Sequence, residues 1–260
     1  MKLTKRNYFS RKANEAYMSV SQFKAFEKCQ NAALAEVQGK YQREETTALL
    51  VGSFVDAYFE GEKEMVKFIN SHPEVFLKGT TIFKAPFQQA NEIIKRIEKD
   101  KLFMEYISGK QQVIMTGEIC GVPVKIMMDS YHPDKMIVDR KIIKNFAPIY
   151  DEEKGHHVPW FEYWGYDIQG AVYQEIVRQN TGKKLPFFLA PATKEKVTDI
   201  DILQINQTQL DSVLDRVQRD IVMYDAIKKG VIEPDRCEFC EYCKNTKVLT
   251  APTDSEEFYF

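Results

Sequence analysis

The sequence predicts a mixed α/β protein: a central mixed β-sheet flanked by helices and preceded by an N-terminal helical region. Apolar residues recur at helical spacing through the first third of the chain. Three short β-branched runs follow, at residues 113–119, 122–129 and 136–143. A long apolar stripe of helical period then occupies residues 208–229. The alternation of these periods favours helices packed against a sheet.

Ser19 and Ser21 are residue types that cap helices, and they precede Phe23, Phe26 and Leu34 at helical spacing. We therefore expect the first helix here. Further helices are expected over residues 48–59 and about 92–106. The His-Pro and Ala-Pro pairs at 72–73 and 85–86 mark loops between these two helices.

The three β-branched runs are separated by turn residues, Cys120-Gly121 and then His132-Pro133-Asp134. This spacing predicts a three-stranded antiparallel meander. A helix over 160–179, strands over 186–190 and 197–205, and the helix over 208–229 complete the order.

We expect one domain over residues 1–260. Residues 1–110 form its mainly helical part, residues 111–205 the catalytic sheet and the following helix, and residues 206–260 the C-terminal helix and a cysteine-rich tail. The absence of a long Gly/Ser linker or internal repeat supports this division.

The composition, with 44% hydrophobic and 28% charged residues, is that of an ordinary globular protein. No apolar run approaches the roughly 20 residues that span a bilayer, so we expect a cytoplasmic protein without a membrane partner. The net charge of −2 lowers the expectation of a protein that coats nucleic acid passively. The same net charge is weaker evidence against a nuclease, because the carboxylates that bind metal in a nuclease offset basic residues elsewhere.

The candidate chemistry lies on two neighbouring strands. Asp129 ends one strand, and Asp139 and Lys141 lie on the next. Because side chains alternate faces, Asp139 and Lys141 point the same way and Arg140 points the other. Two carboxylates and an ammonium are the groups that metal-assisted phosphodiester hydrolysis requires.

A structural interpretation stays open from these residues alone, because Asp-x-Lys is common on exposed strands. One other acidic-x-Lys pair exists, Glu152 and Lys154, in a polar loop. Asp139 instead interrupts an apolar run, where a charge is costly unless it is paired or metal-bound.

The order Asp129, hairpin, Asp139-x-Lys141 resembles the PD-(D/E)XK nuclease superfamily, with Met128 in place of the usual proline. In the following helix, Gln169 and Tyr173 resemble the Q-x-x-x-Y segment of RecB-like exonucleases. Four residues apart, they share one helix face. The resemblance implies a restriction-endonuclease-like core and a metal-dependent deoxyribonuclease.

The resemblance also implies roles for these residues. Asp129 and Asp139 would hold one or two Mg²⁺ or Mn²⁺ ions, with the carbonyl of Arg140 as a further ligand. Lys141 would position the attacking water, and the glutamine and tyrosine of the helix would organise the site.

Two further acidic residues are candidates. The segment from Gly52 to Asp56 resembles the G-x-x-x-H helix of the same group, with aspartate replacing the metal-binding histidine. Glu118 precedes Asp129 on the adjacent strand, where it is a further possible ligand, and Lys125 is a candidate phosphate contact. An ordinary surface aspartate is the alternative for Asp56, and strand residues with solvated ends are the alternative for Glu118 and Lys125.

Over residues 19–247 the chain resembles the RecE-like (exonuclease VIII) group of phages and prophages. That resemblance implies Mg²⁺-dependent 5′ to 3′ resection of linear double-stranded DNA, a ring-shaped homo-oligomer and a single-strand annealing protein as partner. A structure-specific endonuclease on the same fold, and a silent DNA-binding or recombination module, remain the alternatives.

Cys237, Cys240 and Cys243 form a C-x₂-C-x₂-C run, and Cys29 is a candidate fourth ligand. Four thiolates suit Zn²⁺ or a [4Fe–4S] cluster. Several RecB-like nucleases resemble this pattern, with one N-terminal and three C-terminal cysteines. Four reduced, unligated thiols are the alternative.

Overall fold

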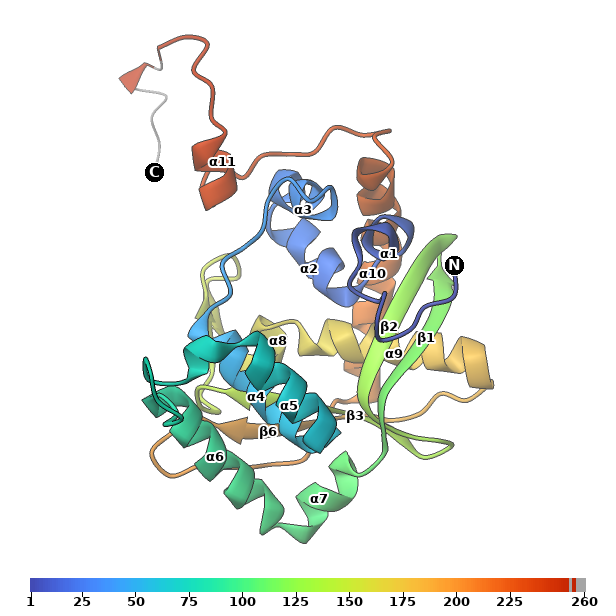
Figure 1. Ribbon diagram of the computed structural model, residues 1–260. Helices are drawn as coiled ribbons and strands as arrows, with labels where there is room; N and C mark the ends of the chain where they lie inside the picture. Colours follow the sequence, from blue (N-terminus) through green and yellow to red (C-terminus); the bar gives the residue numbers. More distant parts are fainter. Residues whose placement is uncertain (253, 256–260) are drawn as a thin grey trace.

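A five-stranded mixed sheet, with strand order β1-β2-β3-β6-β7, forms the centre of the computed structural model, which describes residues 1–252 and 254–255 (Figure 1). The predicted antiparallel meander is confirmed. β6 lies parallel to β3 and antiparallel to β7, which makes the sheet mixed. The strands are β1 (Lys110–Ile119), β2 (Val122–His132), β3 (Met136–Ile143), β6 (Phe187–Thr193) and β7 (Leu203–Gln204).

β2 and β3 separate part-way along the sheet. They are paired only from His132↔Met136 to Ser130↔Val138, whereas β3 stays paired with β6 along its length. Asp129 and Asp139 lie immediately beyond the last paired positions. The divergence frees backbone groups of β3 from the ladder and opens space between the two strands.

The N-terminal helices are α1 (Arg11–Ala16), α2 (Val20–Lys28) and α3 (Gln30–Val37). Ser19 caps α2, as predicted, by accepting a hydrogen bond from the backbone of Gln22. The expected single helix is instead two, because Cys29 is extended, with φ of −165°. In Figure 1 these helices gather with α10 (Gln207–Lys228) on one side of the sheet, and α10 contacts both α2 and α3.

The second helical group is α4 (Thr47–Glu60), α5 (Glu62–Ser71), α6 (Ala85–Glu98) and α7 (Lys101–Ile107), with a short 3₁₀ turn at Pro73–Val75. The expected loop at 85–86 was wrong: this proline lies in the first turn of α6, where its missing N–H needs no partner. The helix expected over 92–106 divides at Asp100, which caps α7.

The C-terminal half contains α8 (Trp160–Tyr163), α9 (Tyr166–Thr181) and the short α11 (Glu241–Asn245). The helix expected over 160–179 is interrupted at Gly165, whose φ is +61°. A small hairpin, β4 (Ile149–Asp151) and β5 (His156–Val158), precedes α8 and was not predicted. The strand expected over 197–205 is reduced to the two residues of β7.

The main core lies between the sheet and α9, which α10 covers. Gly170 of α9 allows this close approach, because a Cβ there would lie 2.5 Å from the ring of Phe187 on β6. Further clusters pack α4 to α7 against β3 and β6. Within the described residues, no helix has the length and apolarity needed to cross a membrane.

Candidate active site and cysteine cluster

Asp139 and Lys141 point to the same side of β3, as the alternation predicts. The Lys141 ammonium contacts Oδ2 of Asp139 in an ion pair whose carboxylate side is only 2% exposed. Oδ2 makes no hydrogen bond, although it is fully buried. One oxygen of a buried carboxylate is therefore held by charge alone.

Asp129 lies at the point where β2 leaves β3. Its Oδ2 accepts a hydrogen bond from the backbone N–H of Arg140 at 3.2 Å, a donor that the divergence of the strands leaves available. Its Oδ1 accepts from the side chain of Gln112 at 3.2 Å. Gln112 lies opposite on β1 with φ of +53°. The geometry thus links Asp129 to the strand that carries Asp139.

Arg140 points to the other side of β3 and meets α4. Its Nε donates to Oδ1 of Asp56 at 3.2 Å, and Nη1 donates to Gln111 at 3.3 Å. The guanidinium lies 5.2 Å from the centre of the Phe59 ring. Asp56 is thus the partner of a buried arginine that lies between Asp139 and Lys141 on β3.

Burial, with the charge of Asp129 as a further cause, raises the pKa of both Asp139 and Asp56. Burial raises the pKa of Asp139 to about 7; Lys141 opposes this rise, and the charge of Asp129 adds to it. Asp56 is 35% exposed, towards the pocket, and burial together with Asp129 raises its pKa to about 6 against the effect of Arg140. Three carboxylates thus face two fixed cations.

Lys141 is an ammonium at neutral pH. Burial by itself would lower its pKa, but Asp139 and Asp129 together raise it above the ordinary lysine value. The Nζ also lies 4.9 Å from the centre of the Tyr166 ring. In this arrangement the group is a cation and a hydrogen-bond donor, and its proton is not readily given up.

Gln169 and Tyr173 of α9 both face the sheet, in keeping with their spacing. The Gln169 amide donates to Oδ1 of Asp139 at 2.5 Å. The Tyr173 hydroxyl donates to the carbonyl of Met127 at 2.8 Å, two residues before Asp129. Gln169 therefore contacts a carboxylate directly, whereas Tyr173 fixes the backbone of β2.

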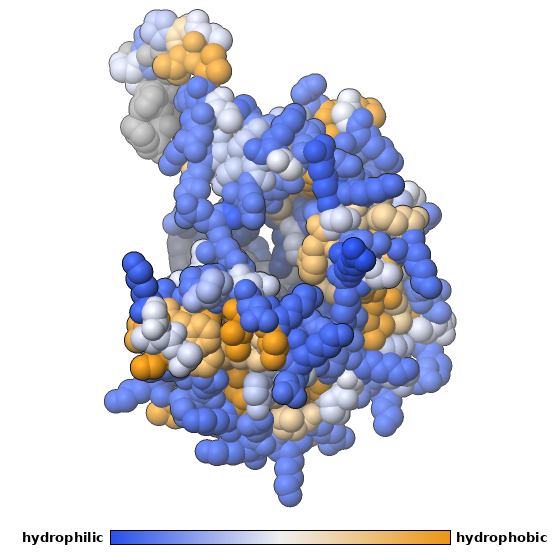
Figure 2. Space-filling view, in the orientation of Figure 1, coloured by the Kyte–Doolittle hydropathy of each residue, from blue (hydrophilic) through white to orange (hydrophobic). Residues whose placement is uncertain are grey.

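A cavity of about 610 Å³ adjoins these groups. It lies between the N-terminal helices, α4, α9 and the sheet. Figure 2 shows a hollow between the N-terminal helices and α4, with hydrophilic residues around it. The polar residues that line it near the site include Lys24, Asp56, Arg140, Lys141, Gln169 and Tyr173.

The donor set fits a hard divalent cation. Carboxylate and carbonyl oxygens are the ligands that Mg²⁺ and Mn²⁺ prefer. The buried Oδ2 of Asp139, without a hydrogen bond, is an acceptor that a cation would satisfy. Each of these two carboxylates also accepts a hydrogen bond from a glutamine amide, Asp139 from Gln169 and Asp129 from Gln112.

Two sequence expectations disagree with the geometry. Glu118 lies opposite Pro123, near the turn of the β1-β2 hairpin, so it is six residues, or roughly 20 Å, from the part of β2 that carries Asp129. Its backbone contacts Gln179 instead. Lys125 is 1% exposed and donates to Tyr8 and Asn14 of the N-terminal region. Neither residue faces the carboxylates.

Sequence reasoning missed Gln112 and Tyr166. Tyr166 lies three residues before Gln169 on α9, so its place on the same helix face followed from the spacing. No pattern in the sequence indicated the contact of Gln112 with Asp129, because Gln112 has a positive φ within β1 and lies before the β-branched run that predicted the strand.

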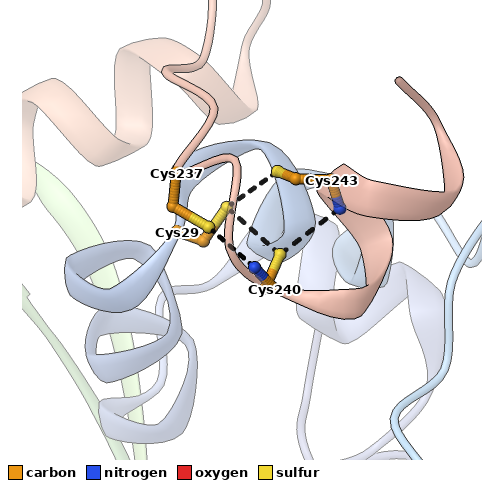
Figure 3. A group of neighbouring side chains, drawn as sticks. All are labelled: Cys29, Cys237, Cys240 and Cys243. Atoms are coloured by element: carbon orange, nitrogen blue, oxygen red, sulfur yellow. Dashed lines mark hydrogen bonds between the residues drawn. The ribbon is translucent and has the colours of Figure 1, made fainter. Parts of the chain in front are cut away.

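The four cysteines form a second candidate site. Cys29 lies between α2 and α3, and the other three lie just before and within α11 (Figure 3). All four sulfur atoms lie within 4.8 Å of one another. Among the described residues this is the only such group of acidic, histidine or cysteine side chains. Segments more than 200 residues apart therefore meet through their thiols, as the spacing suggested.

The thiols are free and accept backbone hydrogen bonds. Sγ of Cys29 lies 3.5 Å from that of Cys243 and 3.8 Å from that of Cys240, too far for a disulfide. The N–H groups of Cys240 and Cys243 donate to Sγ of Cys237 and Cys240. Burial would raise the pKa of Cys237, but the backbone N–H groups of Cys240 and Phe239 and the neighbouring thiols of Cys240 and Cys29 lower it to about 7.

The cluster fits a tetrahedral metal centre. Zn–S bonds of about 2.3 Å place two ligand sulfurs about 3.8 Å apart, close to the separations seen here. The C-x₂-C-x₂-C run with a remote fourth cysteine also matches a ligand pattern of [4Fe–4S] clusters. The four thiols thus satisfy the donor requirement of either group.

A mixed sheet whose diverging β2 and β3 present Asp129, Asp139 and Lys141 together, with helices on both sides, defines a PD-(D/E)XK-like fold. The chain belongs to the family described as "PDDEXK-like domain of unknown function (DUF3799)", which matches residues 19–246.

A crystal structure of a protein from Eubacterium rectale, provisionally named an exonuclease, is similar over almost the whole chain. The identity is 46%, with 98% of this chain and 97% of that chain covered, and the TM-score is 0.93. The crystal structure of SSO0001 gives 13% identity over 80% of this chain and 87% of that chain, with a TM-score of 0.32, too low to support an argument. The search of curated proteins gave no match.

Proposed function

We propose that the protein is a Mg²⁺-dependent deoxyribonuclease that removes nucleotides from the ends of linear double-stranded DNA. The observation that carries the proposal is the arrangement at the point where the strands diverge. Lys141 pairs with Asp139, Asp129 accepts from the backbone N–H of Arg140 between them, and Lys141 lines the adjoining cavity. The provisional name of the Eubacterium rectale protein, which has the same fold at 46% identity, adds support.

In the proposed mechanism, Asp129 and Asp139 would hold the metal, and Asp56 and the carbonyl of Arg140 would be the further candidate ligands. Bound Mg²⁺ would polarise the scissile phosphate and neutralise the charge that develops on it. Lys141 donates a hydrogen bond that orients the attacking water, in keeping with its raised pKa. It does not serve as the general base.

The helix α9 orients these groups. Gln169 fixes one oxygen of Asp139, so that the other oxygen stays directed towards Lys141. Tyr173 fixes the backbone two residues before Asp129. Both are positioning residues, because each acts through a carboxylate or the strand that carries it.

The finer features of the proposal rest on the resemblance to RecE-like exonucleases: 5′ to 3′ polarity, a role in phage-type recombination beside a single-strand annealing protein, and a ring-shaped homo-oligomer. A structure-specific endonuclease is the second candidate. A silent DNA-binding module is the third, and the departure at Asp56 favours it mildly.

The test is cleavage of circular and linear duplex DNA with 5′- or 3′-labelled ends. An exonuclease degrades the linear DNA with Mg²⁺, releases the 5′ label first and spares the closed circle. Lys141→Ala should abolish the activity, whereas the matched control Glu118→Ala should retain it. Full activity of a folded Lys141→Ala protein, or a wild-type protein inactive with Mg²⁺ and Mn²⁺, would refute the proposal.

We also propose that the four cysteines hold a metal centre, either Zn²⁺ or a [4Fe–4S] cluster. A [4Fe–4S] cluster predicts a brown anaerobic preparation that contains iron. A colourless protein with one zinc per chain identifies the single ion. A folded protein that contains neither iron nor zinc would refute the proposal.

A further inference from the structure

Lys24 of α2 lines the cavity but has no acidic partner. Its Nζ donates to the carbonyl of Trp164 at 3.0 Å. In the part of the chain that the structure describes, no carboxylate lies within ion-pair distance of it, whereas Lys141 and Arg140 in the same cavity are both paired. An ammonium has three donors, so Lys24 has two left for a ligand.

The remaining cation of the cavity, Lys125, does not share this property. It is almost fully buried, and it donates to the carbonyl of Tyr8 at 2.5 Å and to the side chain of Asn14 at 2.7 Å. Two of its three donors are therefore used within the protein. The lysine of α2 is the cation that stays available on the wall facing the carboxylates.

Lys24 is close to the proposed reaction centre because it shares an aromatic ring with Lys141. Its Nζ lies 5.3 Å from the centre of the Tyr166 ring, and that of Lys141 lies 4.9 Å from the same centre. Burial, followed by the charge of Lys141, lowers the pKa of Lys24 to about 8, and Asp139 opposes this change. An anion between the two ammonium groups would relieve their repulsion.

The local backbone holds the lysine stem in place. Gly165 has φ of +61°, and a Cβ there would lie 2.8 Å from Cδ of Lys24. The bare glycine thus leaves room for the stem to pass over the turn between α8 and α9. The Lys24 side chain is therefore guided towards Tyr166 by packing as well as by its hydrogen bond.

We propose that Lys24 binds a non-bridging phosphate oxygen of the DNA strand, at the phosphate next to the scissile one. This inference rests on the proposed nuclease function. In this proposal Lys141 and the carboxylates face the scissile phosphate, and Lys24, whose ammonium contacts the same Tyr166 ring, binds the neighbouring one. Lys24 is thus a substrate-binding residue that fixes the register of the strand.

The experiment compares Lys24→Met with wild type on duplex oligonucleotides that carry one uncharged methylphosphonate at successive positions near each end. On unmodified DNA, kcat/KM should fall roughly 10- to 100-fold, the effect of losing one charge-assisted contact. The dependence of log KM on log salt should become shallower by about one unit. Lys24→Arg should restore most of the activity.

The decisive result is that the effects of the Lys24→Met substitution and of one methylphosphonate do not add. At one position the methylphosphonate should slow the wild-type enzyme strongly and slow Lys24→Met little further, because both changes remove the same contact. The control Lys28→Met, on an exposed residue one turn along α2, should behave as wild type at every position.

Three outcomes would overturn the inference while leaving the nuclease function intact. The first is a Lys24→Met variant with wild-type activity. The second is a variant that every methylphosphonate slows by the same factor as wild type, and the third is a loss of activity that a lower melting temperature explains. A wild-type protein that does not cleave DNA would instead refute the proposed function, and it is tested first.

Discussion

Metal binding should strengthen as pH rises through 7, because Asp139 must lose its proton first. Its pKa is raised by burial from the ordinary 3.8 to about 7. Between pH 8 and pH 6 the ionised fraction falls about tenfold, which weakens the apparent Mg²⁺ affinity about tenfold, or by roughly 1.4 kcal/mol. Asp56, with a pKa raised to about 6, contributes in the same direction.

In the metal-free protein, ionisation of Asp139 has the opposite effect, because it lowers the free energy of unfolding. A carboxyl whose folded pKa is raised binds its proton more tightly in the folded state. Asp139 therefore lowers the stability of the metal-free protein as pH rises from about 4 to about 7. Mg²⁺ should therefore raise the free energy of unfolding most above pH 7, where ionised Asp139 lowers the stability of the metal-free protein.

Thermal unfolding with and without Mg²⁺ measures the effect. At a concentration 100 times the dissociation constant at pH 8, binding stabilises by about 2.7 kcal/mol, or roughly 5–10 °C. At pH 6 the same concentration should give about half that shift. Asp139→Asn should remove the response, whereas Glu118→Gln should keep it. An equal Mg²⁺ shift at both pH values, or a normal response of Asp139→Asn, would refute the reasoning.

Three further predictions follow from single contacts. Tyr173→Phe loses the hydrogen bond to Met127, so unfolding should become easier by about 1 kcal/mol and kcat should fall while KM changes little; unchanged kcat would contradict the positioning role. Gly170→Ala places a Cβ against Phe187 and should lower the free energy of unfolding by about 1–3 kcal/mol, as measured by chemical denaturation. Wild-type stability of this variant would contradict the close packing of α9 on β6. Cys243→Ser should reduce the bound zinc or iron and lower the melting temperature, whereas the exposed Cys120→Ser should do neither; elemental analysis distinguishes them.

The sheet could be predicted because its signals are local. β2 and β3 carry β-branched runs bounded by turn residues, and alternation alone placed Asp139 and Lys141 on one side of β3. The spacing of Cys237, Cys240 and Cys243 likewise indicated a local ligand group. Cys29 was a candidate fourth ligand, and its place rested on the resemblance to RecB-like nucleases rather than on neighbouring residues.

Features that depend on non-local pairing could not be read in this way. Glu118 and Asp129 belong to one hairpin, but only its register shows that they lie far apart. The pairing of Arg140 with Asp56 depends on how α4 packs on β3. The break at Cys29 was hidden because apolar spacing continues across it, and only the extended backbone separates α2 from α3.

The two candidate sites are joined by one short helix. Cys29 ends α2 and begins α3, and Lys24 lies just over one turn earlier on α2, where it faces the cavity. The C-terminal segment reaches Cys29 through its three thiols, and the backbone of Asn31 donates to the carbonyl of Asp235 at 3.0 Å. A metal centre here would therefore fix the C-terminal end of α2 and, with it, the direction of Lys24 towards Tyr166. The cysteines lie too far along the helix to touch the carboxylates, so their effect on cleavage should appear in DNA binding before it appears in the chemical step.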